Sequence, residues 1–406
     1  MPSSISSSEA ASFEAASSVL AMAAADGIAK PERFERPGFV RLTASDRPGV
    51  AQPVPVRDIP PQPWNRIFLV ALVLFAMLMI GWELYWRAFG ATPGYQNSDG
   101  MWAMQRRRID HGEGNATVLI GSSRVLFDVQ LPVWQRLSGE RPIQLALEGT
   151  TSLLTLEDLA ADPNFTGRLL VGIAPDIFFS GRSRRAGALK YFHHETPSQR
   201  LGQWLSMHLA EPLLAFDDPD FALATVVKRQ PWPARPGLHS FVDVRKLLVT
   251  GADRNGQIWS KVETDPAYQA LVRKIWLQFF GPPPPGAPSP AQAHKIAAEQ
   301  ITRAAKAVAT LRARGVEVLF VRMPSTGPWL AFENKVFPRA QTWDVLLQRT
   351  ATPGIHFEDY PQLQGYTLPE WSHLSAADAQ RFTAALVPLV KSEFAHEEAQ
   401  MQSVAR

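Results

Sequence analysis

An apolar run near the N-terminus constrains this chain most. Residues Ile67–Trp82 carry no charged side chain, and Leu84–Trp86 extend the run beyond Glu83. A helix needs about 20 mainly apolar residues to cross a bilayer, so the run is long enough if Glu83 lies at the interface. Aromatic side chains, which are enriched at membrane interfaces, stand at both ends: Trp64, Trp82, Tyr85 and Trp86. The sequence therefore predicts a transmembrane helix over residues 64–88; the alternative is a buried core helix.

The preceding residues 1–63 predict a disordered cytoplasmic tail. They begin with a Ser- and Ala-rich stretch and end in AQPVPVRDIPPQP, a composition that buries too little apolar surface to offset chain entropy. Positive charge concentrates on the cytoplasmic side of membrane spans. Seven basic residues precede the run: Lys30, Arg33, Arg36, Arg41, Arg47, Arg57 and Arg66. We therefore expect a single-pass protein of the inner (plasma) membrane whose main domain, residues 89–406, is extracytoplasmic, and periplasmic in a Gram-negative host.

Composition excludes several classes of site. The chain has no cysteine, so disulfides, thiolate metal sites and a cysteine nucleophile are excluded. A net charge of +3 over 406 residues gives no reason to expect nucleic-acid binding, which needs a concentrated basic face. The pair His193–His194 lacks a metal-ligand spacing, and we expect no metal and no cofactor.

Beyond the apolar run, apolar strand patterns alternate with helical ones. Strands are predicted over residues 116–121, 142–149, 168–175 and 316–324, and helices over 131–139, 152–162, 290–315 and 375–394, the last with Ser375 as its N-cap. Such alternation predicts an α/β fold, a mostly parallel sheet with flanking helices. The rhythm breaks near residues 180–290, which we interpret as a largely helical insertion with a Pro-rich return.

Polar residues follow the predicted strands at the edge where α/β proteins bind ligands. Ser123 follows the first strand, Gly149 the second and Asp176 the third, while Glu370 and His373 precede the last helix. A serine hydrolase needs a hydroxyl, an imidazole that activates it, a carboxylate that orients the imidazole, and donors for the oxyanion. We assign Ser123 as nucleophile, His373 as base and Glu370 as the orienting acid, with Asp359 and Glu358 as alternative acids.

This arrangement resembles the SGNH, or GDSL-type, hydrolase superfamily. The blocks that carry the resemblance are Gly121-Ser122-Ser123, Gly149, and Glu370-Trp371-Ser372-His373, and it covers roughly residues 115–180 and 291–395. GSS with a following polar residue is more similar to the membrane-anchored branch, which includes alginate O-acetylation proteins and the D-alanine transfer protein of teichoic acids. The resemblance implies an esterase or O-acyltransferase that modifies an envelope or exported polysaccharide, often partnered by a multi-spanning membrane-bound O-acyltransferase.

Two positions depart from the superfamily pattern. Glu370 stands where an Asp is usual, and the Asn expected after the third strand has no counterpart, since Asp176 lies there. A carboxylate repels an oxyanion, so the backbone N–H groups of Ser123 and Gly149 would act alone, and losing one donor costs about 100- to 1,000-fold in rate. We assign Gly149, Arg124 and Asp176 to oxyanion or substrate binding.

Other features outside these blocks allow two readings each. The basic loop could bind an anionic polysaccharide or a phospholipid headgroup, or be solvated only, and the tryptophans could stack on sugars or fill the core. These residues are Arg182, Arg184, Arg185 and Lys190 in the loop, and Trp204, Trp232, Trp259, Trp276 and Trp329. Three functions stay open at this point: an enzyme, a non-catalytic membrane-tethered glycan-binding or assembly factor, and a spacer subunit whose helix pairs with another membrane protein.

Overall fold

The computed structural model describes residues 61–230, 232, 242, 244–281 and 286–404. The predicted disordered tail lies almost entirely outside these residues. The apolar run forms α2 (Trp64–Phe89), one residue longer than predicted. Among the described residues α2 is the one helix long and apolar enough to cross a membrane, and no residue of its most apolar segment is buried in the protein.

Five parallel strands form the central sheet, so the prediction of an α/β fold with a mostly parallel sheet is confirmed. Their order is β2-β1-β3-β6-β7, the doubly wound order in which ligands bind where the strand order reverses, here between β1 and β3. The bounds are β1 (Thr117–Ile120), β2 (Ile143–Gln144), β3 (Arg168–Ile173), β6 (Glu317–Arg322) and β7 (Gly354–His356). The sequence patterns did not indicate β7, which has only three residues.

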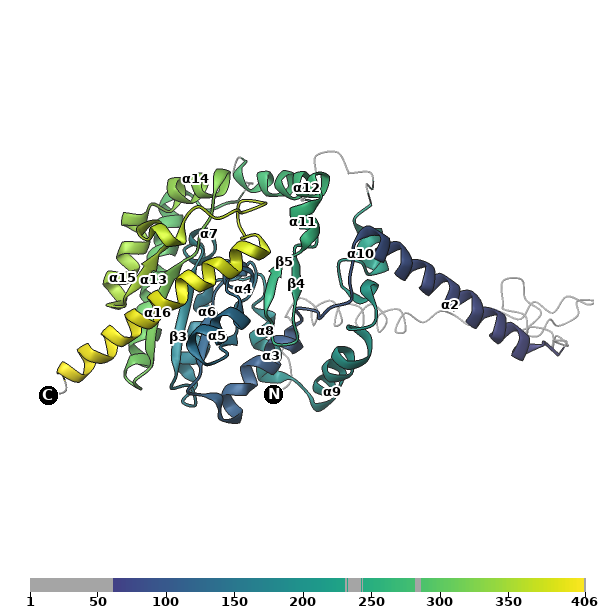
Figure 1. The fold of residues 1–406 in the computed structure, drawn as a ribbon, viewed down its shortest axis with the longest axis horizontal. Helices are drawn as coiled ribbons and strands as arrows, with labels where there is room; N and C mark the ends of the chain where they lie inside the picture. Colours follow the sequence, from purple (N-terminus) through teal and green to yellow (C-terminus); the bar gives the residue numbers. More distant parts are fainter. Residues whose placement is uncertain (1–60, 231, 233–241, 243, 282–285, 405–406) are drawn as a thin grey trace, which may run out of the picture. The chain divides into compact units, whose positions relative to one another are not determined.

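Alternate residues of each strand point to opposite faces, and helices bury both faces. Leu119, Leu170 and Leu319 belong to one apolar cluster with side chains of α5 and α16. Their neighbours Val118 and Leu169 belong to a second cluster with side chains of α6, α13 and α15. Figure 1 shows α16 running in front of the sheet, with α13 and α15 beside it. Burial on both faces explains why these strands are continuous apolar runs.

The flanking helices begin and end at recognisable signals. Gly139, in the left-handed conformation, ends α5, and a capping box between Ser289 and Gln292 opens α13. Ser375 Oγ accepts the N–H of Asp378 at 3.1 Å, as its predicted N-cap role requires. The helices around the sheet are α3 (Asp99–Arg108), α4 (Ser123–Asp128), α5 (Leu131–Ser138), α6 (Ser152–Ala161), α7 (Pro175–Phe178), α13 (Pro290–Arg312), α14 (Gly327–Val336), α15 (Trp343–Thr350) and α16 (Ala376–Val404).

Between α7 and α13 the chain leaves the α/β rhythm. A short antiparallel hairpin interrupts the helices there, a feature that the sequence patterns did not indicate. The elements are α8 (Gly187–His194), α9 (Pro197–Leu205), α10 (Leu223–Lys228), β4 (Leu248–Thr250), β5 (Gly256–Ile258), α11 (Ser260–Thr264) and α12 (Pro266–Leu277). This segment supplies one wall of the cavity described next.

Candidate active site

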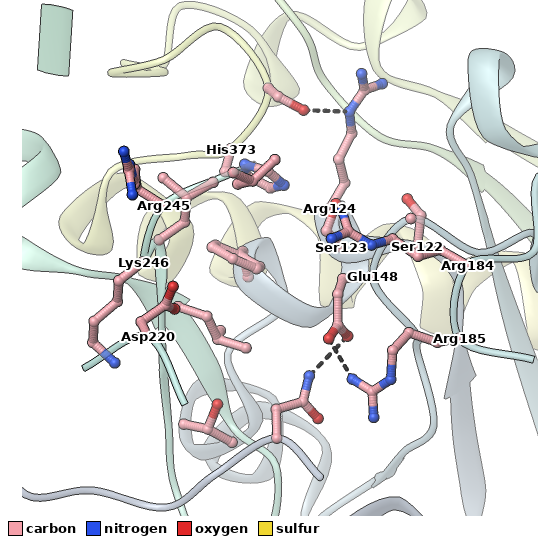
Figure 2. Close-up of a pocket in the computed structure, with 18 of the residues that line it drawn as sticks. Ser122, Ser123, Arg124, Glu148, Arg184, Arg185, Asp220, Arg245, Lys246 and His373 are labelled. Carbon is pink, nitrogen blue, oxygen red and sulfur yellow. Dashed lines mark hydrogen bonds and ion pairs between the residues drawn. The ribbon is translucent and has the colours of Figure 1, made fainter. Parts of the chain in front are cut away.

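A cavity of about 740 Å³ lies at the carboxyl edge of the sheet. Its lining combines residues that follow β1, β2 and β3 with residues just before α16 and residues of the inserted segment. Ser123, Gly149, Asp176 and His373 all line it, and so does Arg124. Figure 2 shows Ser123 and His373 on one side of the cavity and Glu148 with Arg185 below them. Residues from widely separated blocks of sequence therefore share one space.

Ser123 lies at the turn from β1 into α4. It is the first residue of α4 and partly exposed, while the preceding Ser122 has extended backbone (φ −89°, ψ −164°). The turn is tight, because a Cβ on Gly121 would collide with the side chain of Val125. N–H groups in the first turn of a helix have no intrahelical acceptor, and the Ser123 N–H donates no hydrogen bond among the described residues. It is therefore available to an oxyanion.

Glu370 and His373 form a buried pair. Glu370 Oε1 accepts the backbone N–H of His373 at 2.6 Å and its ring Nδ1 at 2.8 Å. Trp371, between them, has a left-handed backbone (φ +73°), a conformation that is unusual for a bulky residue. The two alternative acids lie elsewhere: Asp359 pairs with Arg339 at 2.6 and 2.7 Å, and the Glu358 N–H donates to His356.

The carboxylate fixes the tautomer of His373. Because an ionised carboxylate can only accept, Nδ1 carries the proton, and Nε2 of the neutral ring presents a lone pair. Nε2 is buried and has no hydrogen-bond partner among the described residues. Ser123 Oγ, which lines the same cavity, is thus not hydrogen-bonded to it. The ring stacks on Phe127 of α4, with centroids 4.2 Å apart and planes at 25°.

The second oxygen of Glu370 is held by a residue that sequence reasoning did not assign to the site. Trp276 of α12 donates its indole N–H to Glu370 Oε2, so the buried carboxylate is bonded through both oxygens. A second buried carboxyl, Asp128, accepts the N–H of Leu374 at 2.9 Å. Burial raises the pKa of Asp128 well above its usual range, and the nearby negative charge of Glu370 adds to this effect. No local pattern relates Trp276 to Glu370, 94 positions away.

Arg124 is held by a buried ion pair behind Ser123. Its Nη2 lies 2.7 Å from Glu333 Oε1, and Glu333 also binds Arg322 Nη2 at 2.7 Å and the Ser325 hydroxyl at 2.6 Å. Arg124 Nη1 has no hydrogen-bond partner in the described part of the chain, and Arg124 borders the cavity. Glu333, on α14, has no motif around it that would have placed it here.

Asp176 follows β3 and is 5% exposed. Burial, together with the negative charge of Glu333, raises the pKa of Asp176 to about 6. Although burial also disfavours the Glu333 anion, the charges of Arg124 and Arg322 outweigh it and lower the pKa of Glu333. The proton of this carboxyl pair therefore resides on Asp176, which is neutral below pH of about 6 and does not then repel an oxyanion.

Gly149, the candidate for a second backbone donor, lies at the cavity as well. Its φ of +61° lies in the left-handed region, which glycine adopts without steric cost. Its N–H donates no hydrogen bond among the described residues. The preceding Glu148 is fixed by Asn97, at 2.8 Å, and by Arg185, as the dashed lines in Figure 2 show. The loop after β2 is thereby held at the cavity.

The basic loop divides between paired and exposed side chains. Arg185 binds Asp99 at 2.6 Å as well as Glu148, and Arg182 lies 4.0 Å from Asp176. Arg184 is exposed at the cavity rim, where Figure 2 shows it on the side opposite Arg245 and Lys246. Two further ion pairs line the cavity, Arg229 with Asp220 and Lys246 with Asp218. The cavity lining therefore combines basic side chains with acidic ones.

The tryptophans divide into two groups. Trp259, Trp276 and Trp329 are buried, whereas Trp204 is 50% exposed and Trp232 is 62% exposed. Trp204 and Trp232 therefore do not pack in the core. Within the described ranges, no group of three His, Asp or Glu side chains is arranged to hold a metal ion. His193 instead pairs with Asp158 at 2.6 Å.

Comparison of the chain with protein-family models and with curated proteins yields no match.

Proposed function

We propose that this chain is a membrane-anchored, extracytoplasmic serine esterase or O-acyltransferase of the SGNH-hydrolase type, acting on an envelope or exported polysaccharide. The observation that carries the proposal is the Glu370–His373 pair: His373 lines the same cavity as Ser123, and its Nε2 has no hydrogen-bond partner among the described residues. Such an imidazole lacks only a hydroxyl to deprotonate. The orienting acid and the free ring nitrogen are two of the three groups that acyl transfer through serine requires.

In this mechanism Ser123 Oγ attacks the acyl carbonyl as Nε2 of His373 takes its proton. Glu370, held by Trp276, stabilises the imidazolium that forms. The N–H groups of Ser123 and Gly149 stabilise the oxyanion. The imidazolium then protonates the leaving group, and a sugar hydroxyl or water attacks the acyl-enzyme with His373 again acting as base. Hydrolysis and transfer differ only in which acceptor reaches the acyl-enzyme.

The strand order and the positions of the blocks support an SGNH-like fold. Ser123 and Asp176 follow the two strands that flank the switch point, and Gly149 follows the neighbouring strand. Asp176 occupies the place of the superfamily's Asn. A neutral Asp176 would allow the oxyanion to form there, as a carboxyl that is kept protonated does elsewhere.

Membrane attachment enters the proposal through α2. Its length and apolar surface fit a single span, and the basic residues before it favour a cytoplasmic N-terminus. An enzyme anchored in this way acts on substrates outside the plasma membrane. The acyl donor would come from a second, multi-spanning O-acyltransferase, while the polysaccharide enters the cavity from the aqueous side.

A fluorophosphonate, which labels activated serines, tests the proposal. We expect the purified full chain in mild detergent to be labelled, and the variants Ser123→Ala and His373→Ala to lose labelling. Ser122→Ala is the matched control, because Ser122 also lines the cavity but has no role in the mechanism. Labelling that survives Ser123→Ala, or that is absent from the wild-type chain, contradicts the proposal.

One observation favours a second candidate, a non-catalytic membrane-tethered glycan-binding or assembly factor. Ser123 Oγ makes no hydrogen bond with His373 among the described residues, whereas a working pair is usually within 2.6–3.2 Å, though often looser without substrate. This candidate predicts binding of an acidic polysaccharide that is unchanged in Ser123→Ala, with no fluorophosphonate labelling.

A further inference from the structure

The segment after α8 exposes an unusual apolar stripe. Along α9, the helical turn Ser206–Ala210 and the turn directly after it, leucine and tryptophan side chains recur about one helical turn apart and are between 39% and 62% exposed: Leu201, Trp204, Leu205, Leu209 and Leu213. This spacing places them on one helical face. Isolated exposed leucines are common on soluble proteins, but a continuous stripe that includes tryptophan marks an interaction surface.

Very little of this helical segment is buried against the domain: no residue of α9 is buried, and in the turn Ser206–Ala210 Met207 is the buried one. The side facing the domain carries Gln203, whose Oε1 accepts the hydroxyl of Ser98 at 2.7 Å, and Met207, which is 5% exposed. One polar contact of Gln203 and the buried Met207 side chain thus hold this segment to the protein, while its leucines are exposed. An exposed apolar helical face of this kind is typical of a surface that contacts another protein or a membrane.

The stripe ends at the base of α2. The carboxylate of Glu83 in α2 accepts the backbone N–H groups of Ala215 and Phe216 at 3.0 and 3.2 Å. Arg87 donates to the carbonyl of Leu213 at 3.0 Å. The backbone of the last residue of the stripe is thus bonded directly to α2, which places this end of the stripe next to the end of α2.

Ring stacking fixes the same junction. Trp86 of α2 stacks on Phe221, with ring centroids 4.6 Å apart. The ring centroid of Phe89 lies 6.2 Å from the centroids of Trp259 and Tyr268. Just beyond Phe221, α10 exposes Leu223 (63%) and Val227 (48%), one helical turn apart. The segment docked on α2 thus carries exposed apolar side chains both before Phe221, at Leu213, and after it, at Leu223 and Val227.

We propose that the apolar face of α9 and its following turn, with Leu223 and Val227 of α10, lies in the lipid interface of the bilayer that α2 crosses. The proposal rests on the membrane anchoring in the proposed function. Since Trp64 to Trp82 spans about 28 Å as a helix, close to the thickness of the hydrocarbon core, Glu83 and Arg87 lie at the headgroup level. Leu213, whose carbonyl accepts from Arg87, lies at that depth too. An exposed tryptophan, Trp204, fits this level, which is where such side chains concentrate.

Contact of this apolar face with lipid would hold the domain at the membrane surface, whereas anchoring through α2 alone would let the domain move relative to the bilayer. The acyl donor of the proposed reaction would arrive at that surface. A fixed distance between the cavity and the bilayer would favour transfer from a membrane partner over hydrolysis in solution.

The absence of cysteine from the chain makes depth measurement direct. The full chain, carrying a nitroxide on Leu209→Cys or Leu213→Cys, is reconstituted into vesicles of phosphatidylcholine and phosphatidylglycerol. Collision with oxygen, which partitions into lipid, is compared with collision with a water-soluble nickel chelate. Leu74→Cys in α2 is the lipid reference, and Leu137→Cys, exposed on α5, is the aqueous control.

We expect severalfold higher oxygen-to-nickel collision ratios at positions 209 and 213 than at 137, approaching the ratio at 74. Equal ratios at 209 and 137 overturn the proposal, and low collision with both reagents means that protein covers the stripe and also overturns it. Nickel access at position 74 would overturn the anchoring itself, which separates the two failures. Bromine-labelled lipids give an independent measurement, because quenching of tryptophan fluorescence should fall in Trp204→Phe.

Discussion

Glu370 receives both the main-chain N–H and the ring Nδ1 of His373 through one carboxylate oxygen, at 2.6 and 2.8 Å. The other oxygen accepts the indole N–H of Trp276. Three donors on one fully buried carboxylate fix the orientation of the imidazole and direct Nε2 away from Glu370.

Replacing Glu370 with Gln should lower the rate of fluorophosphonate labelling by about 100-fold or more, because the amide no longer fixes the Nδ1–H tautomer or stabilises the imidazolium. The measurement is the second-order labelling constant of the purified full chain. Glu358→Gln is the matched control, since that residue was the sequence alternative and does not contact His373. Equal rates for the two variants would remove Glu370 from the mechanism.

Trp276→Phe should lower stability by about 1–3 kcal/mol beyond the effect of lost packing, because it leaves a buried carboxylate oxygen without its donor. Trp329→Phe offers a close comparison. Trp329 packs edge-on against Trp276, at 5.2 Å, and its indole N–H has no partner among the described residues. Urea unfolding in mild detergent, followed by near-ultraviolet circular dichroism, measures both. A loss in Trp329→Phe as large as in Trp276→Phe would contradict the prediction.

Glu333→Gln should lower stability by about 3–5 kcal/mol, because it leaves two buried guanidinium groups, Arg124 and Arg322, without their counter-charge. Glu157→Gln breaks a pair with Arg303 whose side chains are more than a third exposed, and such surface pairs contribute about 1 kcal/mol or less. The same unfolding assay compares the two variants. Similar small losses in both would show that the buried cluster is not held by Glu333.

Asp176→Asn should stabilise the chain at neutral pH but not near pH 4. The raised pKa of Asp176, about 6, exceeds its ordinary value in an unfolded chain, so the folded state binds more protons between the two values. Wild-type stability therefore falls as pH rises through this window. Two pKa units correspond to at most about 3 kcal/mol. The advantage of the variant should reach this limit above pH of about 6, and a difference independent of pH would contradict the assignment.

Local patterns in the sequence predicted several elements because those elements depend on neighbouring residues. The apolar run predicted α2, apolar stretches predicted β1, β3 and β6, and a serine before a helical pattern predicted the start of α16. Periodicity and capping act over a few positions, so one sequence suffices. By the same reasoning β7, with three residues, fell below what periodicity can detect.

The strand ends also placed the candidate residues correctly in one region, because parallel strands present their carboxyl ends at the same edge. Ser123, Gly149, Asp176 and His373 do share one cavity. The hydrogen bonds and ion pairs that these residues make within the cavity could not be predicted from the sequence blocks.

The tertiary structure alone decided the partners. Three acids were available to His373 by sequence distance, and the left-handed turn at Trp371 brings Glu370 to it, while Arg339 holds Asp359. Arg124 pairs with Glu333, which is more than 200 positions away in the sequence, and Glu83 binds the inserted segment. Such contacts depend on how separate elements pack, and burial then sets which carboxyls are ionised, so no local pattern specifies them.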